Sequence, residues 1–352
     1  MKLAIVAITA GGAELARRLG REAGEEQVWL PQRLRAEDGC RYFAEPVTDL
    51  LPRLFTEVDG LVCIMATGIV VRTLAPHLRG KAVDPAVVVL DEAGEFAISL
   101  LSGHLGGAND LARELAELTA GRAVITTATD VNGLPAWDEV ARRLGYGVEP
   151  LAHLKTLNRL LLEGKPIHLV DRAGKVSGAF AGVPAVRLCA TFGEALQPGA
   201  AGAVFVSNRH LPQLAGEPNL LALRPKNLMV GIGCNRGTAA DEIETAVRQA
   251  LQRAFLAFGS IGQVASIDAK ADEPGLLEFA NRHGLPLQFH PAAALNDILV
   301  PSPPSVHALA AVGASGVCEP AALLSAVGGS LLVRKQKVGN VTVAVAEQVA
   351  GG

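Results

Sequence analysis

A glycine-rich stretch between Ser99 and Asp110 carries side chains that can support acid–base chemistry. The apolar spacing over 103–119 predicts an amphipathic helix that begins near Gly103. In its first turn, the positive end of the helix dipole would lower the pKa of His104 and favour neutral imidazole, the form that a general base needs. The alternative is that Ser102 caps the helix and His104 is an ordinary surface histidine. Candidate residues of this stretch are Ser102, Gly103, His104, Gly106, Gly107 and Asn109.

Two more groups of polar residues follow apolar runs that predict strands, over 60–65 and 86–90. Ligands of open parallel sheets bind at the carboxyl ends of strands. Asp91 and Glu92 are therefore candidate catalytic carboxylates, and a solvated turn explains them equally well. Thr67, Gly68 and Arg72 follow the other run and are candidate binding residues, although Arg72 can equally form a surface ion pair.

A glycine turn near the start of the last third of the chain is a candidate anion site. Gly231, Gly233 and Gly237 follow a predicted strand over 227–232 and precede a predicted helix capped by Thr238. Backbone N–H groups at a helix start favour an anion, and Arg236 adds a cation. The spacing departs from the dinucleotide-binding pattern G-x-G-x-x-G. Carboxylate or phosphate binding and a purely structural turn are the main interpretations, and dinucleotide binding is a minor third.

Ser266 and Lys270 follow the predicted strand 264–267 and would open beside this turn. Lys270 can meet a substrate carboxylate there, or it can belong to a charged, exposed turn. The sequence has no H-E-x-x-H, cysteine cluster, P-loop or G-x-S-x-G. Metal, ATP and serine-hydrolase chemistry therefore have little support.

Alternating apolar strands and amphipathic helices predict an α/β protein. We expect two parallel-sheet α/β units that flank a smaller middle domain. The expected bounds are 1–130 for the N-terminal domain, 131–223 for the middle domain and 226–352 for the C-terminal domain. The 352 residues are more than one compact core usually holds.

The composition excludes several classes of protein. With 49% hydrophobic and 19% charged residues the chain is not disordered. A net charge of -3 offers no general attraction for nucleic acid or anionic lipid, and no apolar run is long enough for a membrane span. Five dispersed cysteines without a C-x-x-C pair, and no signal peptide, predict a cytoplasmic protein with reduced thiols.

Stretches at both ends of the chain together resemble the cobalt-precorrin-5A hydrolase family of the oxygen-independent cobalamin pathway. The stretches that carry the resemblance are 64–72, 84–91, 101–109, 231–238, 266–270 and 316–322. They match in order and spacing, whereas 131–223 matches only loosely. Asn235 stands where the family often carries a second basic residue.

The resemblance implies hydrolytic opening of the ring A δ-lactone of cobalt-precorrin-5A, with release of acetaldehyde, to give cobalt-precorrin-5B. The cobalt belongs to the corrinoid substrate, so no further cofactor or metal is expected. Neighbouring enzymes of the pathway and further copies of the chain are left open as partners. A nucleotide-dependent oxidoreductase or methyltransferase, and a corrinoid-binding protein without catalysis, are the alternatives.

Within this interpretation His104 is the base, with Asp91 or Glu92 in reserve, and Ser102 donates to the developing oxyanion. Cations hold the carboxylates that fringe the substrate. The residues assigned to substrate binding are Thr67, Gly68, Arg72, Gly103, Gly106, Gly107, Asn109, Gly231, Gly233, Arg236, Gly237, Ser266, Lys270 and Glu319.

Overall fold

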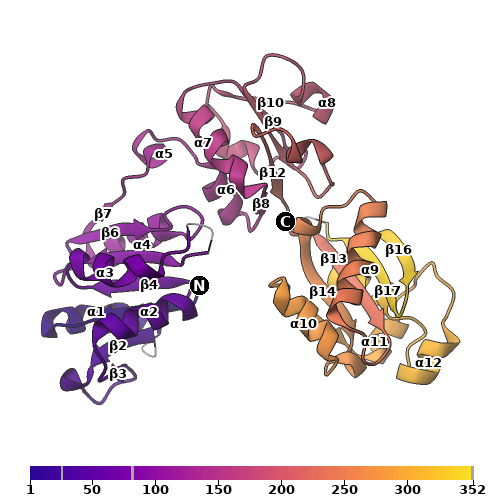
Figure 1. Cartoon of the computed structure of the whole chain (residues 1–352), viewed down its shortest axis with the longest axis horizontal. Helices are drawn as coiled ribbons and strands as arrows, with labels where there is room; N and C mark the ends of the chain where they lie inside the picture. Colours follow the sequence, from indigo (N-terminus) through magenta and orange to yellow (C-terminus); the bar gives the residue numbers. More distant parts are fainter. Residues whose placement is uncertain (25–26, 81–82, 350–352) are drawn as a thin grey trace. The chain divides into compact units, whose positions relative to one another are not determined.

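The computed structural model describes residues 1–24, 27–80 and 83–349, and its strands form three sheets (Figure 1). The chain divides into two compact units, Met1–Arg142 and Arg143–Gly352. The first unit contains a seven-stranded sheet, and the second contains two five-stranded sheets. The predicted α/β class is confirmed, whereas the bounds of the three domains stay a prediction.

The first sheet has the strand order β3-β2-β1-β4-β5-β6-β7. All neighbouring strands are parallel except β5 and β6, which are antiparallel. The strands are β1 (Leu3–Ala7), β2 (Val28–Pro31), β3 (Arg41–Phe43), β4 (Gly60–Ile64), β5 (Ala86–Leu90), β6 (Phe96–Leu101) and β7 (Arg122–Val124). The apolar runs over 60–65 and 86–90 predicted β4 and β5, whereas the antiparallel β6 was not predicted.

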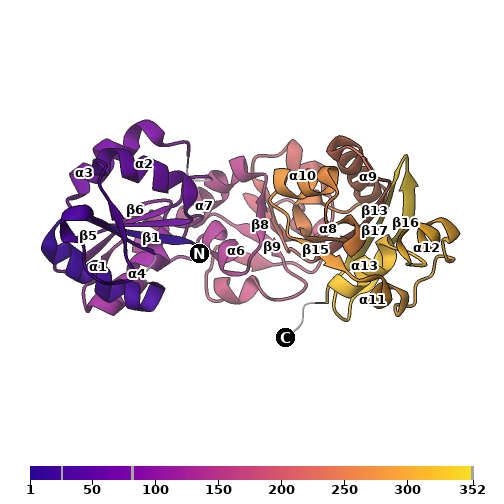
Figure 2. The same ribbon diagram turned by 90° about the horizontal axis from the view of Figure 1, so that it is seen from below.

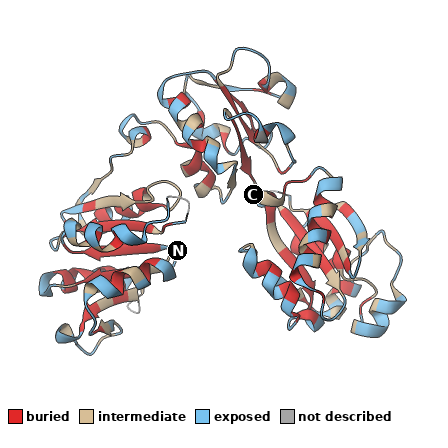
Figure 3. Cartoon of the chain, in the orientation of Figure 1, coloured by how far each residue is buried: buried red, intermediate tan, exposed pale blue. Residues whose placement is uncertain are grey.

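Helices cover both faces of this sheet, as Figure 2 shows. The helices α1 (Ala10–Ala23) and α4 (Ala108–Thr119) pack on one face. The helices α2 (Val47–Glu57) and α3 (Thr67–Leu74) pack on the other. Every residue of β4 and β5 is buried between these two layers (Figure 3). Continuous apolar strands of this kind are typical of sheets covered on both sides.

The middle sheet has the order β10-β9-β11-β12-β8. Only its edge strand β8 is antiparallel to its neighbour, β12. Its strands are β8 (Gly147–Glu149), β9 (Ile167–Val170), β10 (Val186–Leu188), β11 (Gly202–Val206) and β12 (Leu220–Arg224). The helices α6 (Trp137–Arg143), α7 (Leu154–Leu162) and α8 (Phe192–Ala195) lie in or next to this part of the chain.

The third sheet has the order β15-β14-β13-β17-β16 and is mixed rather than parallel, because β17 is antiparallel to both β13 and β16. Its strands are β13 (Leu228–Cys234), β14 (Ile261–Ile267), β15 (Leu287–His290), β16 (Ser330–Val338) and β17 (Val341–Glu347). Helices α9 (Ala240–Arg253) and α10 (Pro274–Arg282) pack on one face. On the other face lie α11 (Ala292–Asn296) and α13 (Cys318–Ser325), and the short α12 (Val306–Val312) precedes α13.

No helix in the described part of the chain has the length and apolar character needed to cross a bilayer.

The close approach of α13 to β13 depends on Gly231. A Cβ atom at this position would lie 1.8 Å from the carbonyl oxygen of Cys318. The predicted turn at Gly231 and Gly233 is therefore wrong, since both lie inside β13 and Gly231 lies under a helix. The predicted cap is also wrong: the helix α9 follows Ala239, and the Thr238 hydroxyl donates to the Asn235 carbonyl at 2.8 Å.

We expect Gly231→Ala to destabilise the second unit by about 1–3 kcal/mol or more, the usual cost of overpacking, because α13 must move off the sheet. Thermal unfolding followed by circular dichroism measures this loss. Gly193→Ala is the control, since a Cβ there meets nothing within 4 Å. Equal stability of the two variants would contradict the packing role of Gly231.

Candidate functional site

The loop around His104 is the first candidate site, and it is not the start of a helix. Helix α4 begins at Ala108, and Gly107, with φ of 89°, precedes it. The expected helix over 103–119 is thus wrong in its first five positions, so His104 receives no first-turn dipole. Ser102 is not the cap either, because it has φ of 57° and donates its hydroxyl to the Asp84 carbonyl at 2.9 Å.

The glycines of this loop allow it to fold on itself. A Cβ at Gly103 would lie 2.7 Å from Asn109 Oδ1, and a Cβ at Gly106 would lie 2.5 Å from Ser102 Cβ. Asn109 is buried, and its amide nitrogen donates to Thr127 Oγ1 at 2.9 Å. Gly103, Gly106 and Asn109, which were predicted to bind substrate, therefore stabilise the fold of the loop.

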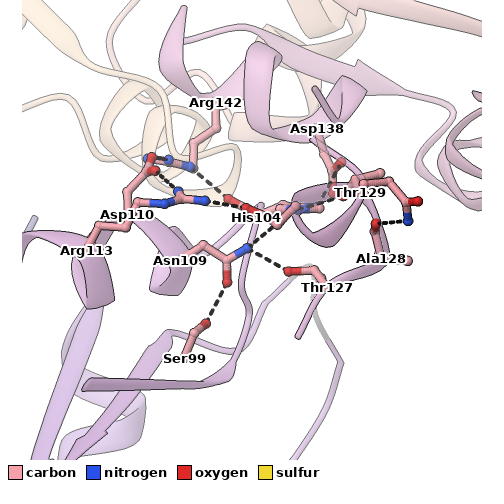
Figure 4. Close-up of polar contacts among 12 residues, drawn as sticks. Ser99, His104, Asn109, Asp110, Arg113, Thr127, Ala128, Thr129, Asp138 and Arg142 are labelled. Atoms are coloured by element: carbon pink, nitrogen blue, oxygen red, sulfur yellow. Dashed lines mark hydrogen bonds and ion pairs between the residues drawn. The ribbon is translucent and has the colours of Figure 1, made fainter. Parts of the chain in front are cut away.

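His104 lies between the carboxylates of Asp130 and Asp138, and Figure 4 labels Asp138 beside it. Its Nε2 is 2.9 Å from Asp130 Oδ2, and its Nδ1 is 3.5 Å from Asp138 Oδ1. Arg113 pairs with the other oxygen of Asp130, and Arg142 Nε donates to the His104 carbonyl at 2.8 Å. The imidazole thus joins the loop to the segment 130–138.

The protonation state of His104 is the opposite of the expected one. Burial alone would lower its pKa, but hydrogen bonds and charge attraction from Asp138 and Asp130 outweigh burial and raise the pKa to about 9. The ring is therefore an imidazolium at neutral pH, so the premise that it is a neutral base is wrong.

The same cluster also meets the distance criterion for a metal site. One ligand atom each from His104, Asp130 and Glu139 lie within 4.8 Å of one another. The fit is poor, however, because a metal would have to displace the proton that the raised pKa keeps on His104 and compete with Arg113 for Asp130.

The remaining predicted residues of the first unit lie at the opposite edge of its sheet. Strand β6 runs back along β5, with Ala97 opposite Leu90 and Leu101 opposite Val87. At about 3.3 Å per residue, this run separates the His104 loop from the carboxyl end of β5 by roughly 13 Å. The sequence analysis assigned the His104 loop and the carboxylates of Asp91 and Glu92 to one catalytic site, but the sheet separates them.

The side chains at the carboxyl edge make mainly local contacts. Asp91 accepts backbone N–H groups of Ala93, Glu95 and Phe96 at 2.9, 3.2 and 2.7 Å. Burial raises its pKa, but these N–H groups lower it more. The turn interpretation of Asp91 is therefore correct.

Glu92 and the α3 residues complete this edge. Glu92 accepts the Thr9 hydroxyl at 2.8 Å, and Thr9 is the N-cap of α1. Thr9 was not predicted from the sequence, although it lies just after the first strand. Arg72 forms no surface ion pair among the described residues; it donates to the carbonyl of Gly68 at 3.0 Å, which lies one turn before Arg72 in α3.

The second unit contains a pocket of about 590 Å³ at the carboxyl ends of β13 and β14. Its basic lining residues are Arg236, Lys270, His307, Lys335 and Lys337, and no Asp or Glu of the described residues lines it. Of the predicted residues, Gly233, Arg236 and Lys270 line this pocket, whereas Gly231, Gly237, Ser266 and Glu319 do not. Ligands of open α/β sheets bind at this edge.

The cations of the pocket differ in how far protein carboxylates neutralise them. Lys270 Nζ is 3.1 Å from the buried Glu273, and Arg236 Nη1 is 2.7 Å from Asp272. Within 1–24, 27–80 and 83–349, Lys335 and Lys337 have no ion-pair partner, and both are exposed. The sequence analysis missed these two lysines, although their alternation on a strand would place them on one face.

Glu319 is buried outside the pocket lining and connects segments next to the pocket. Its carboxylate accepts the Ser302 hydroxyl at 2.9 Å and the Lys335 backbone N–H at 2.9 Å. Ser266 is also buried and donates to the Ile232 carbonyl at 2.7 Å. Both side chains thus hold protein elements together, and their contact with substrate stays a prediction.

The fold and the pocket define an α/β protein with a basic cavity suited to an anionic small molecule. Three family models match the chain: Cobalamin synthesis G N-terminal over residues 49–130, Cobalamin biosynthesis central region over 135–225, and Cobalamin synthesis G C-terminus over 228–346. These matches include the His104 loop and most of the lining of the pocket.

Two curated relatives match over almost the whole length. Cobalt-precorrin-5A hydrolase of Priestia megaterium is 38% identical, over 97% of this chain and 94% of its own. Cobalt-precorrin-5A hydrolase of Salmonella typhimurium is 34% identical, over 98% of this chain and 97% of its own. The crystal structure of cobalamin biosynthesis protein chiG from Agrobacterium tumefaciens is 30% identical, over 34% of this chain and 98% of that one, with a TM-score of 0.27. The chain belongs to the cobalt-precorrin-5A hydrolase family.

The raised pKa of His104 predicts how the stability of the first unit depends on pH. The imidazolium is bound more tightly in the folded chain, so its contribution is complete below pH 6.5 and is lost as the pH rises through about 9. We expect a loss on the order of 3 kcal/mol between pH 7 and pH 10. Denaturant unfolding followed by tryptophan fluorescence measures it, because Trp29 and Trp137 both lie in the first unit.

His104→Gln should remove most of this pH dependence, whereas the exposed His77→Gln should retain it. If wild type and His104→Gln lose the same stability between these pH values, the carboxylates do not hold a charged imidazole.

Proposed function

We propose that the chain hydrolyses cobalt-precorrin-5A in cobalamin biosynthesis, opening the ring A δ-lactone and releasing acetaldehyde. One observation on the molecule itself carries the proposal. The pocket of the second unit gathers basic side chains with no Asp or Glu in its lining. A corrinoid fringed with carboxylates is a ligand that such a pocket suits. The names of the two full-length relatives support hydrolysis of cobalt-precorrin-5A.

Lys335 and Lys337 are the cations that we assign to the substrate carboxylates. Lys270 and Arg236 already face Glu273 and Asp272, so a bound carboxylate gains less from them. Lys270 and Arg236 neutralise the charges of Glu273 and Asp272 next to the pocket. In this proposal, Arg236 and Lys270 therefore contribute less to binding of the substrate carboxylates than the sequence predicted.

Lactone opening needs a base for the attacking water and donors for the developing oxyanion. His307 is the histidine that lines the pocket, and it is exposed. We assign the base to His307 because His104 is already protonated at neutral pH. The Cys234 thiol also lines the pocket, but burial raises its pKa and keeps it from acting as a thiolate.

The metal of the reaction is the cobalt that the substrate brings, and the proposal needs no further cofactor. A corrinoid-binding protein without catalysis would bind the same ligand in the same pocket. Acetaldehyde release separates the two functions, because binding alone does not cleave a carbon–carbon bond.

We expect Lys335→Gln/Lys337→Gln to weaken binding of the cobalt substrate by about 1.5–3 kcal/mol for each charged hydrogen bond that it removes. The loss should appear in KM and leave kcat within a few fold. Steady-state acetaldehyde formation measures both constants. Lys155→Gln/Lys165→Gln removes the same charge from the middle domain and is the matched control; if it loses as much affinity, the pocket does not hold the carboxylates.

The two imidazoles predict different rates in single-turnover acetaldehyde formation at neutral pH. His307→Gln should lower the rate by about 10²–10⁴, the worth of a placed general base, with substrate affinity retained. His104→Gln should stay within a few fold at a temperature where it remains folded. The reverse order of effects would return catalysis to the His104 loop.

A further inference from the structure

A second cavity of the second unit, of about 530 Å³, lies at the carboxyl ends of the middle sheet. The parallel strands β9, β11 and β12 end at this edge, and the segments that follow them line the cavity. The chain leaves β9 for β10 on one side and then returns to β11 on the other. The strand order therefore reverses between β9 and β11, which is where open α/β sheets bind ligands.

The lining of this middle-sheet cavity is strongly basic. It includes Arg172, Lys175, Arg209 and Lys226, and none of these side chains has an ion-pair partner among the residues that the structure describes. Its one carboxylate, that of Glu347, accepts Asn208 Nδ2 at 2.7 Å and Asn227 Nδ2 at 3.0 Å. These amides hold the acid on one wall, and the four cations still outnumber this one carboxylate in the lining.

Aromatic rings complete the lining. Tyr146 lies between α6 and β8, and Phe192 opens α8 with its ring 5.2 Å from that of Phe205. Such rings offer a flat apolar surface on which a planar ligand can stack. The cavity thus combines several cations with aromatic surface.

We propose that the middle-sheet cavity binds a small polyanion whose carboxylate or phosphate groups are attached to a flat ring system. Carboxylated tetrapyrroles and nucleotides share this chemistry. The proposal uses neither the Lys335 and Lys337 pocket nor turnover, so it can fail while the proposed hydrolase function stands.

Equilibrium binding to the intact chain tests the proposal with two probes, uroporphyrin, a porphyrin octacarboxylate, and ADP. The variant Arg172→Gln/Lys175→Gln/Arg209→Gln removes three exposed charges from the cavity. The control Arg159→Gln/Lys165→Gln/Arg187→Gln removes three exposed charges from the same domain outside it. We expect at least one probe to bind, the cavity variant to weaken it tenfold or more, and the control to weaken it less than twofold.

Loss of uroporphyrin binding alone would identify a tetrapyrrole site, and loss of ADP binding alone would identify a nucleotide site. The proposal fails if neither probe binds at millimolar concentration or if the two triple variants lose the same affinity. It also fails if only Lys335→Gln/Lys337→Gln loses binding, a result that would leave the proposed hydrolase pocket intact.

Discussion

The buried carboxylate of Glu319 is the constraint on which the pocket of the second unit depends. It lies in the first turn of α13 and accepts hydrogen bonds from Ser302, which precedes α12, and from the backbone of Lys335 in β16. A buried carboxylate is stable only when such donors satisfy it, so the elements that supply them must stay in place. Gly231 adds a third contact, because its missing Cβ lets α13 pack directly against the sheet. Together these contacts hold three walls around one cavity.

The two units use charge in different ways. In the first unit the charged groups neutralise one another, since His104 lies between Asp130 and Asp138, and Arg113 pairs with Asp130. Such a network fixes a loop and leaves little charge for a ligand. In the second unit Lys335 and Lys337 stay without an acidic partner among the described residues. Uncompensated cations in a cavity attract a polyanionic ligand, and this difference is the reason that we propose the second unit as the place of substrate binding.

The sequence predicted those elements whose pattern has one physical meaning. Strand β5 was predicted with its observed bounds, because the continuous apolar run over 86–90 is typical of a buried strand. Glycines were misinterpreted in both units. A glycine that lets a helix pack closely, as Gly231 does, cannot be distinguished in the sequence from one that opens a ligand-binding loop. The pKa of His104 was predicted with the wrong sign because Asp130 and Asp138 come to it through tertiary folding. Lys335 and Lys337 were missed because lysines on an edge strand commonly serve only to prevent aggregation.

The most direct test of this account is hydrogen–deuterium exchange of the intact chain with and without cobalt-precorrin-5A. If the pocket behind Lys335 and Lys337 holds the substrate, backbone amides over 302–319 and 333–343 should exchange more slowly in its presence. The segment 102–107 and the edge at Asp91 should change little. Protection confined to the first unit, with no change around α12, α13 and β16, would contradict the account.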